Sequence, residues 1–535
     1  MSNDQSPHAS TWSPLRQLLF RALWLASVAS NIGTWMQNVG AAWLMTSLAP
    51  SPTMVALVQA ATSLPVFLVG LPAGAIADLV DRRRLLLATQ GWMLAAASVL
   101  GVLTFLDAIT PWSLLTLTFA LGLGAAMNAP AWQAIIPELV GDAELRGAVT
   151  LNGVGYNVAR AVGPALGGIV VATLGSSAVF ILNACSFLGV MVVLYRWPRT
   201  VNVSALPAED VFGAMRAGVR YVRHAPAVQA VLLRTGAFIF GGSALWALLP
   251  LVARDELALD ATGYGVILGC LGAGAVAGGL FLPRLERWLS TDALLAGAIA
   301  LFAVATAGPV YARHIALLCV VMIAGGVAWI AIMSTFNVAA QVTVPAWVRA
   351  RALAVYGIVS QGGMALGSAF WGLVAERVSL STTLLLAGAT LAVGIVTTLR
   401  YRLRLDEEID FSPSQHWPEP ILSMHPEPDA GPVLVTVEYM IDAARAQEFA
   451  TAMRGVRLQR LRDGAYRWGL YNDSATPTRF LETFVVESWA EHLRQHERVT
   501  VADKETEDVV RAFHIGAAPP AISHLIYARA MAPKR

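Results

Sequence analysis

Long apolar stretches dominate the chain from residue 18 to residue 400. Each is long enough to be a transmembrane helix, because a helix needs about 20 mostly apolar residues to cross the hydrocarbon core of a bilayer. The twelve stretches lie at about 18–46, 53–77, 85–107, 112–136, 148–172, 176–196, 227–252, 262–284, 292–311, 315–340, 350–375 and 380–400. Short polar connections separate them. The pattern predicts an all-α membrane protein with twelve transmembrane helices.

The longest polar interruption divides the stretches into two groups of six. We expect one six-helix half at 1–197, a cytoplasmic linker at 198–226 and a second half at 227–405. The linker contains an arginine-rich amphipathic helix, which lies either on the protein surface or at the membrane interface.

Polar residues recur in the same order in the two halves. The chain has Asn128, Gln133, Pro137 and Arg146 from within the fourth stretch onwards, and Asn337, Gln341, Pro345 and Arg349 from within the tenth. Two related halves of this kind predict a substrate cavity between them, near the middle of the membrane.

Several polar and aromatic residues fall at membrane depth and are candidates for lining that cavity. They are Asn31, Trp35, Asn38, Asn128, Trp132, Gln133, Asn157, Arg160, Asn337 and Gln341. Polar side chains at this depth must face other helices or water. For any single amide, a hydrogen bond between helices is the alternative to a cavity position.

Arg160 is the one charge near the middle of a predicted helix. A charge in lipid is costly, so this guanidinium must face the protein interior or water. Two interpretations stay open. Arg160 attracts an anionic or catechol-like substrate, or it forms a structural pair with a carboxylate such as Asp78 or Glu138.

The pattern changes after residue 400. A proline-rich linker at 406–431 precedes a segment, 432–535, in which strand-like and helix-like periods alternate. Strands are expected at Val433–Tyr439, Tyr466–Tyr471, Phe480–Glu487 and Ile522–Tyr527, and helices at Asp442–Arg462, Trp489–Arg498 and Asp503–Phe513. This βαββαβ order predicts a small cytoplasmic α+β domain of ferredoxin-like type. His492 and His496 have a metal-compatible spacing on one helix, but no third ligand is evident, so we interpret them as solvated and expect no metal.

Composition and charge support the division into two parts. Hydrophobic residues make up 56% of the 535 residues and charged residues only 13%, which excludes an ordinary soluble globule. The first 400 residues carry 36 charges and the last 135 carry another 36. The net charge of +2 argues against nucleic acid as a partner. The sequence has no phosphate-loop motif for ATP hydrolysis, and no cofactor is expected.

Arginines mark the orientation in the membrane. The even-numbered connections hold thirteen of them and the odd-numbered connections hold three. Because arginine is enriched on the cytoplasmic side, both termini are expected in the cytoplasm.

The connection between the second and third stretches contains Gly74, Asp78, Arg82 and Arg83. This spacing resembles motif A of the major facilitator superfamily, although Leu79 stands where that family usually has a base. The resemblance implies a charged latch that gates the cytoplasmic face. Gly74 is expected to allow a close approach of helices.

The fifth stretch contains Gly163, Pro164, Gly167 and Gly168. These residues resemble motif C, the antiporter motif of the same superfamily. The alternative is a packing face of small residues with no bearing on the direction of transport.

Further signatures follow in order at Asn31–Gln37, Asp78–Arg84, Asn128–Gln133, Pro137–Val140 and Asn157–Pro164. Together they resemble the enterobactin-exporter-like, or transmembrane secretion effector, branch of the superfamily. The resemblance implies the major facilitator fold, a bacterial inner membrane and proton-driven efflux of a small molecule such as a siderophore, drug or secondary metabolite. An uptake transporter of the same fold is the alternative. No carboxylate lies deep in a predicted helix, so the proton site stays open.

The segment Phe480–Leu493 resembles small dimeric α/β-barrel proteins that include the antibiotic-biosynthesis monooxygenases. This resemblance implies a homodimer through the C-terminal domain, or a ligand-sensing or enzymatic role for it. The chain as a whole is expected to be a transporter and not an enzyme.

Overall fold

The computed structural model of the protein describes residues 11–49, 51–197, 211–396, 401–403, 410–417 and 426–528. The chain divides into two compact units. The helical unit comprises Met1–Pro207, Leu232–Val338 and Tyr356–Leu403. The appended unit comprises Ala208–Val231, Ala339–Val355 and Arg404–Arg535. The appended unit thus combines the C-terminal fold with two connections from the helical part of the sequence.

Each predicted apolar stretch coincides with one long helix. The helices are α1 (Leu18–Leu48), α2 (Pro52–Leu79), α3 (Arg82–Phe105), α4 (Pro111–Leu139), α5 (Asp142–Leu174), α6 (Ser176–Arg196), α8 (Pro226–Leu251), α9 (Ala261–Leu285), α10 (Thr291–Ala307), α11 (Ile315–Val342), α12 (Arg349–Arg377) and α13 (Leu380–Gly394). Ten of the described helices are long and apolar enough to cross a membrane. The amides along α1 lower its hydropathy, and α13 is shorter, at 15 residues. The prediction of a helical membrane protein is confirmed.

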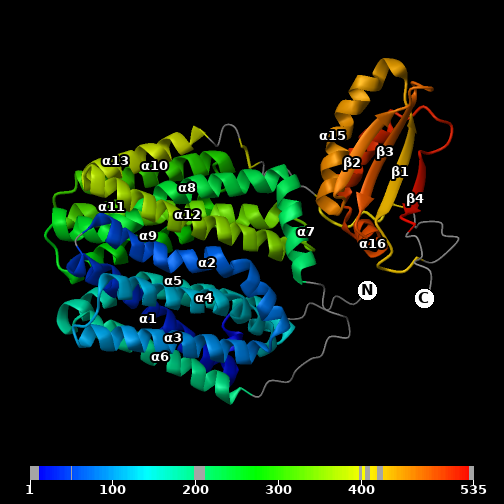
Figure 1. Cartoon of the computed structure of the whole chain (residues 1–535). Helices are drawn as coiled ribbons and strands as arrows, with labels where there is room; N and C mark the ends of the chain where they lie inside the picture. The colour runs from blue at the N-terminus through cyan, green and yellow to red at the C-terminus, as the bar shows by residue number, and fades with distance from the viewer. Residues whose placement is uncertain are drawn as a thin grey trace, which may run out of the picture. The chain divides into compact units, whose positions relative to one another are not determined.

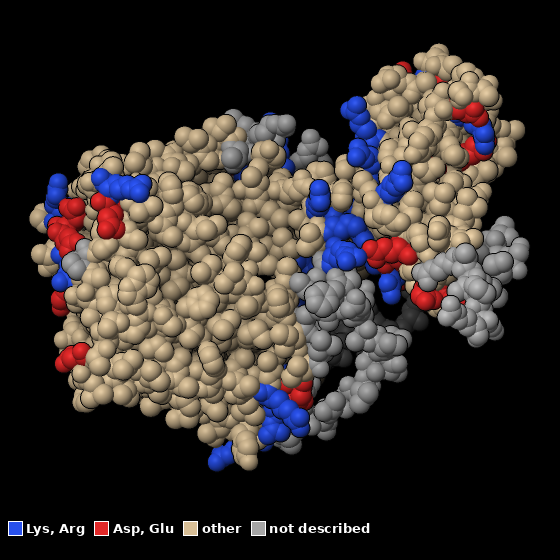
Figure 2. All heavy atoms as spheres, in the orientation of Figure 1, with Lys and Arg blue, Asp and Glu red and all other residues tan. Residues whose placement is uncertain are grey.

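The long helices of the helical unit lie side by side, as Figure 1 shows. Within this unit α5 contacts α1 and α6 of the first half and α9 of the second half. Figure 2 shows a broad face of these helices without charged side chains, while arginines and carboxylates gather towards the helix ends. This distribution suits a bilayer, in which a charge on a lipid-facing surface is costly.

Polar side chains at the connections define where several helices begin. Asp81 accepts a hydrogen bond from the backbone N–H of Arg84 at the start of α3, at 2.8 Å. Asp260 does the same for Gly263 at the start of α9. Thr110 and Ser113 form a capping box before α4. Caps of this kind satisfy backbone donors that have no partner within the helix.

The C-terminal fold is a four-stranded antiparallel sheet covered by helices on one face. Its elements are β1 (Val433–Met440), α15 (Ala446–Asp463), β2 (Arg467–Asn472), β3 (Arg479–Val486), α16 (Trp489–Arg498), α17 (Val501–Arg511) and β4 (Ala521–Ile526), and the strand order is β2-β3-β1-β4. Val435 pairs with Phe484 on one side and His524 on the other. The predicted strands and helices are therefore present, with ends shifted by a few residues.

The burial pattern of the sheet follows the strand period of two. Alternate residues of β1, from Val433 to Tyr439, are buried with Phe480 and Phe484 of β3. Val437, Tyr439 and Phe480 of this set pack against Phe449 and Met453 of α15. Ser488 caps α16 by accepting from the N–H of Glu491.

Two further segments belong to the appended unit. Helix α7 (Val211–His224) is the predicted amphipathic helix of the linker, and it contacts α15. Residues Asp410–Trp417, here called the strap, run along the junction of α16 and α17. The strap is held there by hydrogen bonds from the N–H groups of Ser414, Val501 and Ala502 to backbone carbonyls across the junction.

Candidate functional site

Arg160 of α5 lies beside two tryptophans of the second half. Its guanidinium carbon is 5.7 Å from the ring centroid of Trp246 in α8 and 5.9 Å from that of Trp329 in α11. Cation–π attraction of this kind stabilises an arginine that lacks water. The central charge of the sequence therefore sits between the two halves of the helical unit.

Two donors of this cluster have no acceptor. The Nε of Arg160 and the Nε1 of Trp246 are buried, and neither has a hydrogen-bond partner among the described residues. Buried donors are almost always paired, so an orphan in a native structure calls for an explanation. A ligand oxygen between the two groups would provide one.

The structure shows no pairing of Arg160 with either of its two predicted carboxylate partners, Asp78 and Glu138. Glu138 instead pairs with Arg82, with 2.8 Å between its Oε1 and the arginine Nη1. The side chain of Asp78 lies outside the described residues. No ion pair involving Arg160 occurs within the part of the chain that the structure describes, so the structural-pair interpretation has no support there.

Aromatic residues of the second half extend the site. Phe238 of α8 lies 5.4 Å from Phe302 of α10 and 5.6 Å from Trp329, between ring centroids. Phe336 of α11 lies 6.4 Å from Phe238. In sequence these aromatics look like ordinary apolar helix residues, so periodicity alone could not separate them from packing residues.

The other predicted cavity residues have different environments. Asn128 of α4 accepts hydrogen bonds from Thr89 at 3.0 Å and Gln90 at 3.3 Å, both in α3. Its oxygen thus joins two helices of the same half, which was the alternative for any single amide. Asn157 is exposed and donates to the Gly153 carbonyl of its own helix, at 3.0 Å.

The remaining members of the predicted set lie on α1, α4 and α11. Asn31, Trp35 and Asn38 are half-buried on α1, and the Trp35 ring is 6.4 Å from Tyr156 of α5. Trp132 lines a small apolar hollow together with residues of α1 and α5. Gln133 and Asn337 are exposed, and Gln341 is half-buried.

A buried amide pair was not predicted. Asn183 of α6 donates to Gln37 of α1 at 2.6 Å. Both side chains are buried, at 1% and 4% exposure, so this bond holds two helices of the first half together. Gln37 stood within the α1 signature, but its partner is 146 residues away in sequence.

The arginines of the motif A segment bind the ends of neighbouring helices. Arg82 donates to Glu138 and to the Ala134 carbonyl of α4, at 2.8 and 3.2 Å. Arg83 donates to the carbonyls of Leu194 and Tyr195 at the end of α6. An arginine that served only to mark the cytoplasmic surface would not require these contacts with the ends of two neighbouring helices. The close approach expected at Gly74 is not found within the part of the chain that the structure describes, where a Cβ at this position would meet no atom within 4 Å.

The glycines of the motif C segment do allow close packing, on two sides of α5. A Cβ at Gly163 would come within 2.6 Å of Trp35, and one at Gly167 within 2.8 Å of Met36. On the other side, a Cβ at Gly168 would lie 2.5 Å from the Ala261 carbonyl of α9. Pro164 lies within the same helix, and a Cβ on Gly265 of α9 would meet its carbonyl at 2.7 Å. Helix α5 thus joins its own half to the other.

Polar contacts join the two halves near the odd-numbered connections. Arg254 donates to Thr46 at 2.9 Å and to Ser47 at 3.3 Å. Glu376 of α12 accepts from Ser51 at 3.0 Å and from Thr53. These contacts lie at the helix ends opposite the motif A segment.

The histidines of the C-terminal fold are not solvated as expected. The side chain of His492 is 1% exposed. Its ring centroid lies 4.9 Å from that of His496 and 4.7 Å from that of His524. Burial lowers the pKa of His492 to about 3, and the neighbouring histidines act in the same direction. Burial likewise lowers the pKa of His496 to about 4. Among the described residues no group of three His, Cys, Asp or Glu side chains is arranged to hold a metal ion.

A model of the family described as "Transmembrane secretion effector" matches residues 9–531. The chain belongs to this family. The transmembrane secretion effectors are major facilitator transporters, so the predicted superfamily is confirmed. The separate resemblance of the C-terminal fold to antibiotic-biosynthesis monooxygenases stays a prediction, although the antiparallel sheet is present.

Curated relatives of this transmembrane secretion effector include efflux and siderophore transporters. It is 23% identical over 385 residues to the "Staphyloferrin A transporter" of Staphylococcus aureus (strain NCTC 8325 / PS 47), covering 70% of this chain and 95% of the relative. It is 27% identical over 408 residues to the "Multidrug efflux pump Tap" of Mycolicibacterium fortuitum, covering 73% and 96%. The "Enterobactin exporter EntS" of Salmonella typhi is 25% identical over 272 residues, covering 50% and 64%.

Solved structures share the fold of the helical part. A bacterial homologue of the iron transporter ferroportin, in an inward-facing state, superposes with a TM-score of 0.56 at 16% identity, covering 72% of this chain and 98% of that one. A bacterial homologue of the lysosomal transporter Spinster, also inward-facing, gives a TM-score of 0.54 at 15% identity, covering 72% and 95%. The chain is therefore a multi-pass membrane transporter with the major facilitator fold.

Proposed function

We propose that the protein exports a small molecule across the inner membrane of a bacterium by alternating access driven by protons. The family match, and relatives named for efflux and siderophore transport, support export. The twelve long helices and the arginine-rich even-numbered connections support twelve transmembrane helices with both termini in the cytoplasm.

The environment of Arg160 is the observation from which we infer the chemical class of the substrate. The Arg160 guanidinium has a buried Nε and no carboxylate partner among the described residues, and it lies beside the indoles of Trp246 and Trp329. It therefore has capacity for an anionic oxygen and for a flat ring at one place. The substrate is therefore an aromatic or conjugated molecule with a carboxylate, phenolate or catecholate group. Siderophores and many secondary metabolites have this chemistry.

The contacts between the halves suggest how the site opens and closes. In this structure α5 packs against α9 through facing glycines, and Arg254 and Glu376 join the halves near the odd-numbered connections. Opening the site to the exterior requires these polar contacts to break. Arg82 and Arg83 of the motif A segment then close the cytoplasmic side, which is the gating role proposed for Gly74, Asp78, Arg82 and Arg83.

Protons need a titrating group that is coupled to this movement. Glu138 is our candidate among the described carboxylates because it pairs with Arg82 at the cytoplasmic end. Loss of that pair would release the start of α3 from the end of α4.

The C-terminal fold is proposed to form a homodimer through the open face of its sheet. Leu434 of β1 lies between Val485 of β3 and Leu525 of β4 on that face, and Leu525 is 53% exposed. Pairing of two such faces would bury an apolar patch that water otherwise covers.

Transport in everted membrane vesicles tests the proposed function. Vesicles energised with ATP should accumulate radiolabelled 2,3-dihydroxybenzoylserine, an aromatic carboxylate. The variant R160A should lower the initial rate at least tenfold, because the probe loses the guanidinium that pairs with its anionic oxygen. A matched control is R284A, which removes an arginine 5.7 Å from the Phe281 ring at the end of α9 and should transport normally.

Two results would contradict the proposal. Accumulation in right-side-out vesicles alone would show uptake instead of export. Equal rates for R160A and the unmodified protein would exclude the Arg160 site.

A further inference from the structure

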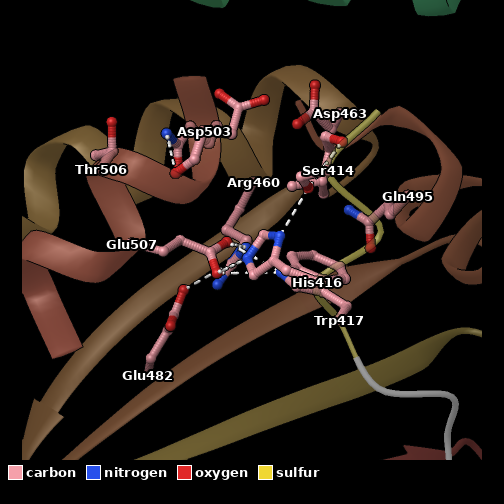
Figure 3. A network of polar contacts seen from close by, with 12 residues as sticks. Ser414, His416, Trp417, Arg460, Asp463, Glu482, Gln495, Asp503, Thr506 and Glu507 are labelled. Atoms are coloured by element: carbon pink, nitrogen blue, oxygen red, sulfur yellow. Dashed lines mark hydrogen bonds and ion pairs between the residues drawn. The ribbon is translucent and has the colours of Figure 1, made fainter. Parts of the chain in front are cut away.

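The strap places two side chains over a buried cluster of charges in the C-terminal fold. Figure 3 shows His416 and Trp417 of the strap next to Arg460 of α15 and Glu507 of α17. The Trp417 Nε1 donates to Glu507, at 3.1 Å to Oε2 and 3.2 Å to Oε1. The guanidinium carbon of Arg460 lies 4.7 Å from the Trp417 ring. The indole therefore occupies a slot with a cation on its face and a carboxylate at its N–H.

His416 makes a second polar contact with the carboxylate of Glu507. Its Nε2 lies 3.0 Å from Glu507 Oε2, and its Nδ1 lies 2.7 Å from the hydroxyl of Ser414. The ring of His496 closes the slot edge-on, 5.0 Å from Trp417 between centroids. Three side chains of the strap thus act as a single plug.

Two buried carboxylates below the strap share one buried guanidinium, and the partly exposed Arg511 lies 4.0 Å from Glu507. Arg460 donates to both Glu482 and Glu507, at 3.1 and 2.6 Å, and all three residues are buried. Burial would raise the pKa of Glu507, but Arg460 and His416 outweigh it and lower the pKa to about 2. One guanidinium thus faces two carboxylates. A buried carboxylate needs further donors, and at Glu507 the strap provides them.

The strap is not an integral part of the sheet fold. It precedes β1, and Ser412, Pro413 and Gln415 on it are exposed. Gln415 lies between Ser414 and His416, which seal the slot. Its φ is +47°, in the left-handed region that residues other than glycine rarely adopt. Strain of this kind persists at functional sites where surrounding contacts hold it.

A second, independent feature points to a ligand at this place. Gln495 of α16 is 0% exposed, yet its Nε2 has no hydrogen-bond partner among the described residues. Figure 3 shows this side chain beside the strap. If the strap only covered the charged cluster, the unpaired Nε2 of Gln495 beside it would have no explanation. A ligand that accepts a hydrogen bond from this group would provide one.

We propose that the strap is a tethered occupant of a ligand site, and that the free ligand is a flat aromatic amine that displaces it. The ring takes the place of the Trp417 indole against Arg460 and His496. A ring N–H donates to Glu507, and the ammonium group takes the place of His416. The strap follows α13 in the chain with few residues between them, so displacement changes the tether of the C-terminal fold. This site is separate from Arg160 and does not depend on the proposed substrate.

Binding of tryptamine to the full-length protein in detergent micelles tests the proposal. Tryptamine has an indole N–H and an ammonium group on one small molecule. By isothermal titration calorimetry, W417A should bind it at least tenfold more tightly than the unmodified protein, because the internal competitor has been removed. W288A removes an exposed tryptophan of the helical unit, 86% exposed, and should bind like the unmodified protein.

Two further comparisons test the chemistry of the slot. Replacing Glu507 in the W417A protein, as E507Q, should weaken tryptamine binding at least tenfold. Indole-3-propionate, with a carboxylate in place of the ammonium group, should not bind the W417A protein measurably. Equal affinity of W417A and the unmodified protein for tryptamine would overturn the proposal, and so would tight binding of indole-3-propionate.

Cysteine labelling tests the proposal without the W417A variant, in case that variant does not fold. Ser414 is a half-buried residue of the strap itself, so S414C should be alkylated slowly in the otherwise unmodified protein and faster with millimolar tryptamine. Peptide mass spectrometry separates this site from Cys185, Cys270 and Cys319. S412C, on an exposed strap residue, should label fast with or without tryptamine. Protection of S414C that does not change with tryptamine would also overturn the proposal.

Discussion

Arg220 of α7 donates to Glu491 at the start of α16, with 2.8 Å between Nη2 and Oε1. Glu491 also accepts from Arg498 at 2.7 Å, and Arg498 stacks on Trp347 with 4.4 Å to the ring centroid. Burial would raise the pKa of Glu491, but the two arginines outweigh it and lower the pKa. Since α7 leads directly into α8, this carboxylate connects the C-terminal fold to the linker between the two halves.

Substitution of Glu491 should loosen α7. In E491Q two largely buried guanidinium groups lose their shared anion, which should cost about 1–3 kcal/mol of local stability. Hydrogen exchange across residues 216–224 should accelerate accordingly. E487Q is the matched control: it removes the pair of Glu487 with Arg216, whose side chains are 54% and 71% exposed, and such exposed pairs contribute little. Equal exchange in both variants would contradict the connecting role of Glu491.

Substitution of Glu376 should shift the protein towards the state in which the two halves part near the odd-numbered connections. E376Q keeps the size of the side chain but weakens its hydrogen bonds from Ser51 and Thr53. Electron–electron resonance between nitroxides at Trp112 and Tyr311, both exposed, should show the longer distance enriched by a factor of roughly two to five.

The control for that experiment is E286Q, a change at an exposed carboxylate near the opposite end of the second half. Its distance distribution should match that of the unmodified protein. If E376Q also leaves the distribution unchanged, the contact does not hold the halves together.

Acid should destabilise the C-terminal fold before the helical unit. The ordinary pKa of histidine is about 6.5, whereas burial, reinforced by His496 and His524, brings that of His492 to about 3. Below pH 6.5 the unfolded chain binds more protons, so the stability contributed by the neutral histidine is present above that pH and is lost as the pH falls towards about 3. Between pH 6.5 and 5 the loss from His492 is about 2 kcal/mol.

Hydrogen exchange of β1 and β3 at pH 7 and pH 5, corrected for intrinsic rates, measures this effect. H492Q should reduce the difference between the two pH values. H314Q, at an exposed histidine of the helical unit, should not change it. A C-terminal fold that is equally protected at both pH values in the unmodified protein would show that the histidines titrate normally.

Two glycines should respond oppositely to alanine. In G168A the new Cβ would lie 2.5 Å from the Ala261 carbonyl and 2.9 Å from the Gly265 Cα, both backbone atoms of α9. Overpacking of this kind costs about 1–3 kcal/mol. In G74A the Cβ enters open space, and alanine is favoured over glycine in a helix by about 0.5–1 kcal/mol. Thermal unfolding in detergent should therefore rank G74A at or above the unmodified protein and G168A below it; the reverse order would contradict the packing.

The limits of prediction from sequence are visible at particular residues. The ranges of the long helices and of the four strands were predictable because hydropathy and alternation are local properties, and the cap at Ser488 follows from its position before Trp489. Motif spacing predicted that Gly168 packs closely, but the same reasoning failed at Gly74. A small residue shows that an approach is allowed, not that a neighbour is there.

The sequence by itself determined that this chain is a helical membrane protein with an appended α+β fold, since apolar length and strand period follow directly from the order of residues. Only the tertiary structure decided which groups meet. Arg160 reaches Trp246 and Trp329 from 86 and 169 positions away, His492 is buried by His524, and the strap places Trp417 on Glu507. These relationships join helices and strands far apart in the chain, and periodicity carries no information about partners at that distance.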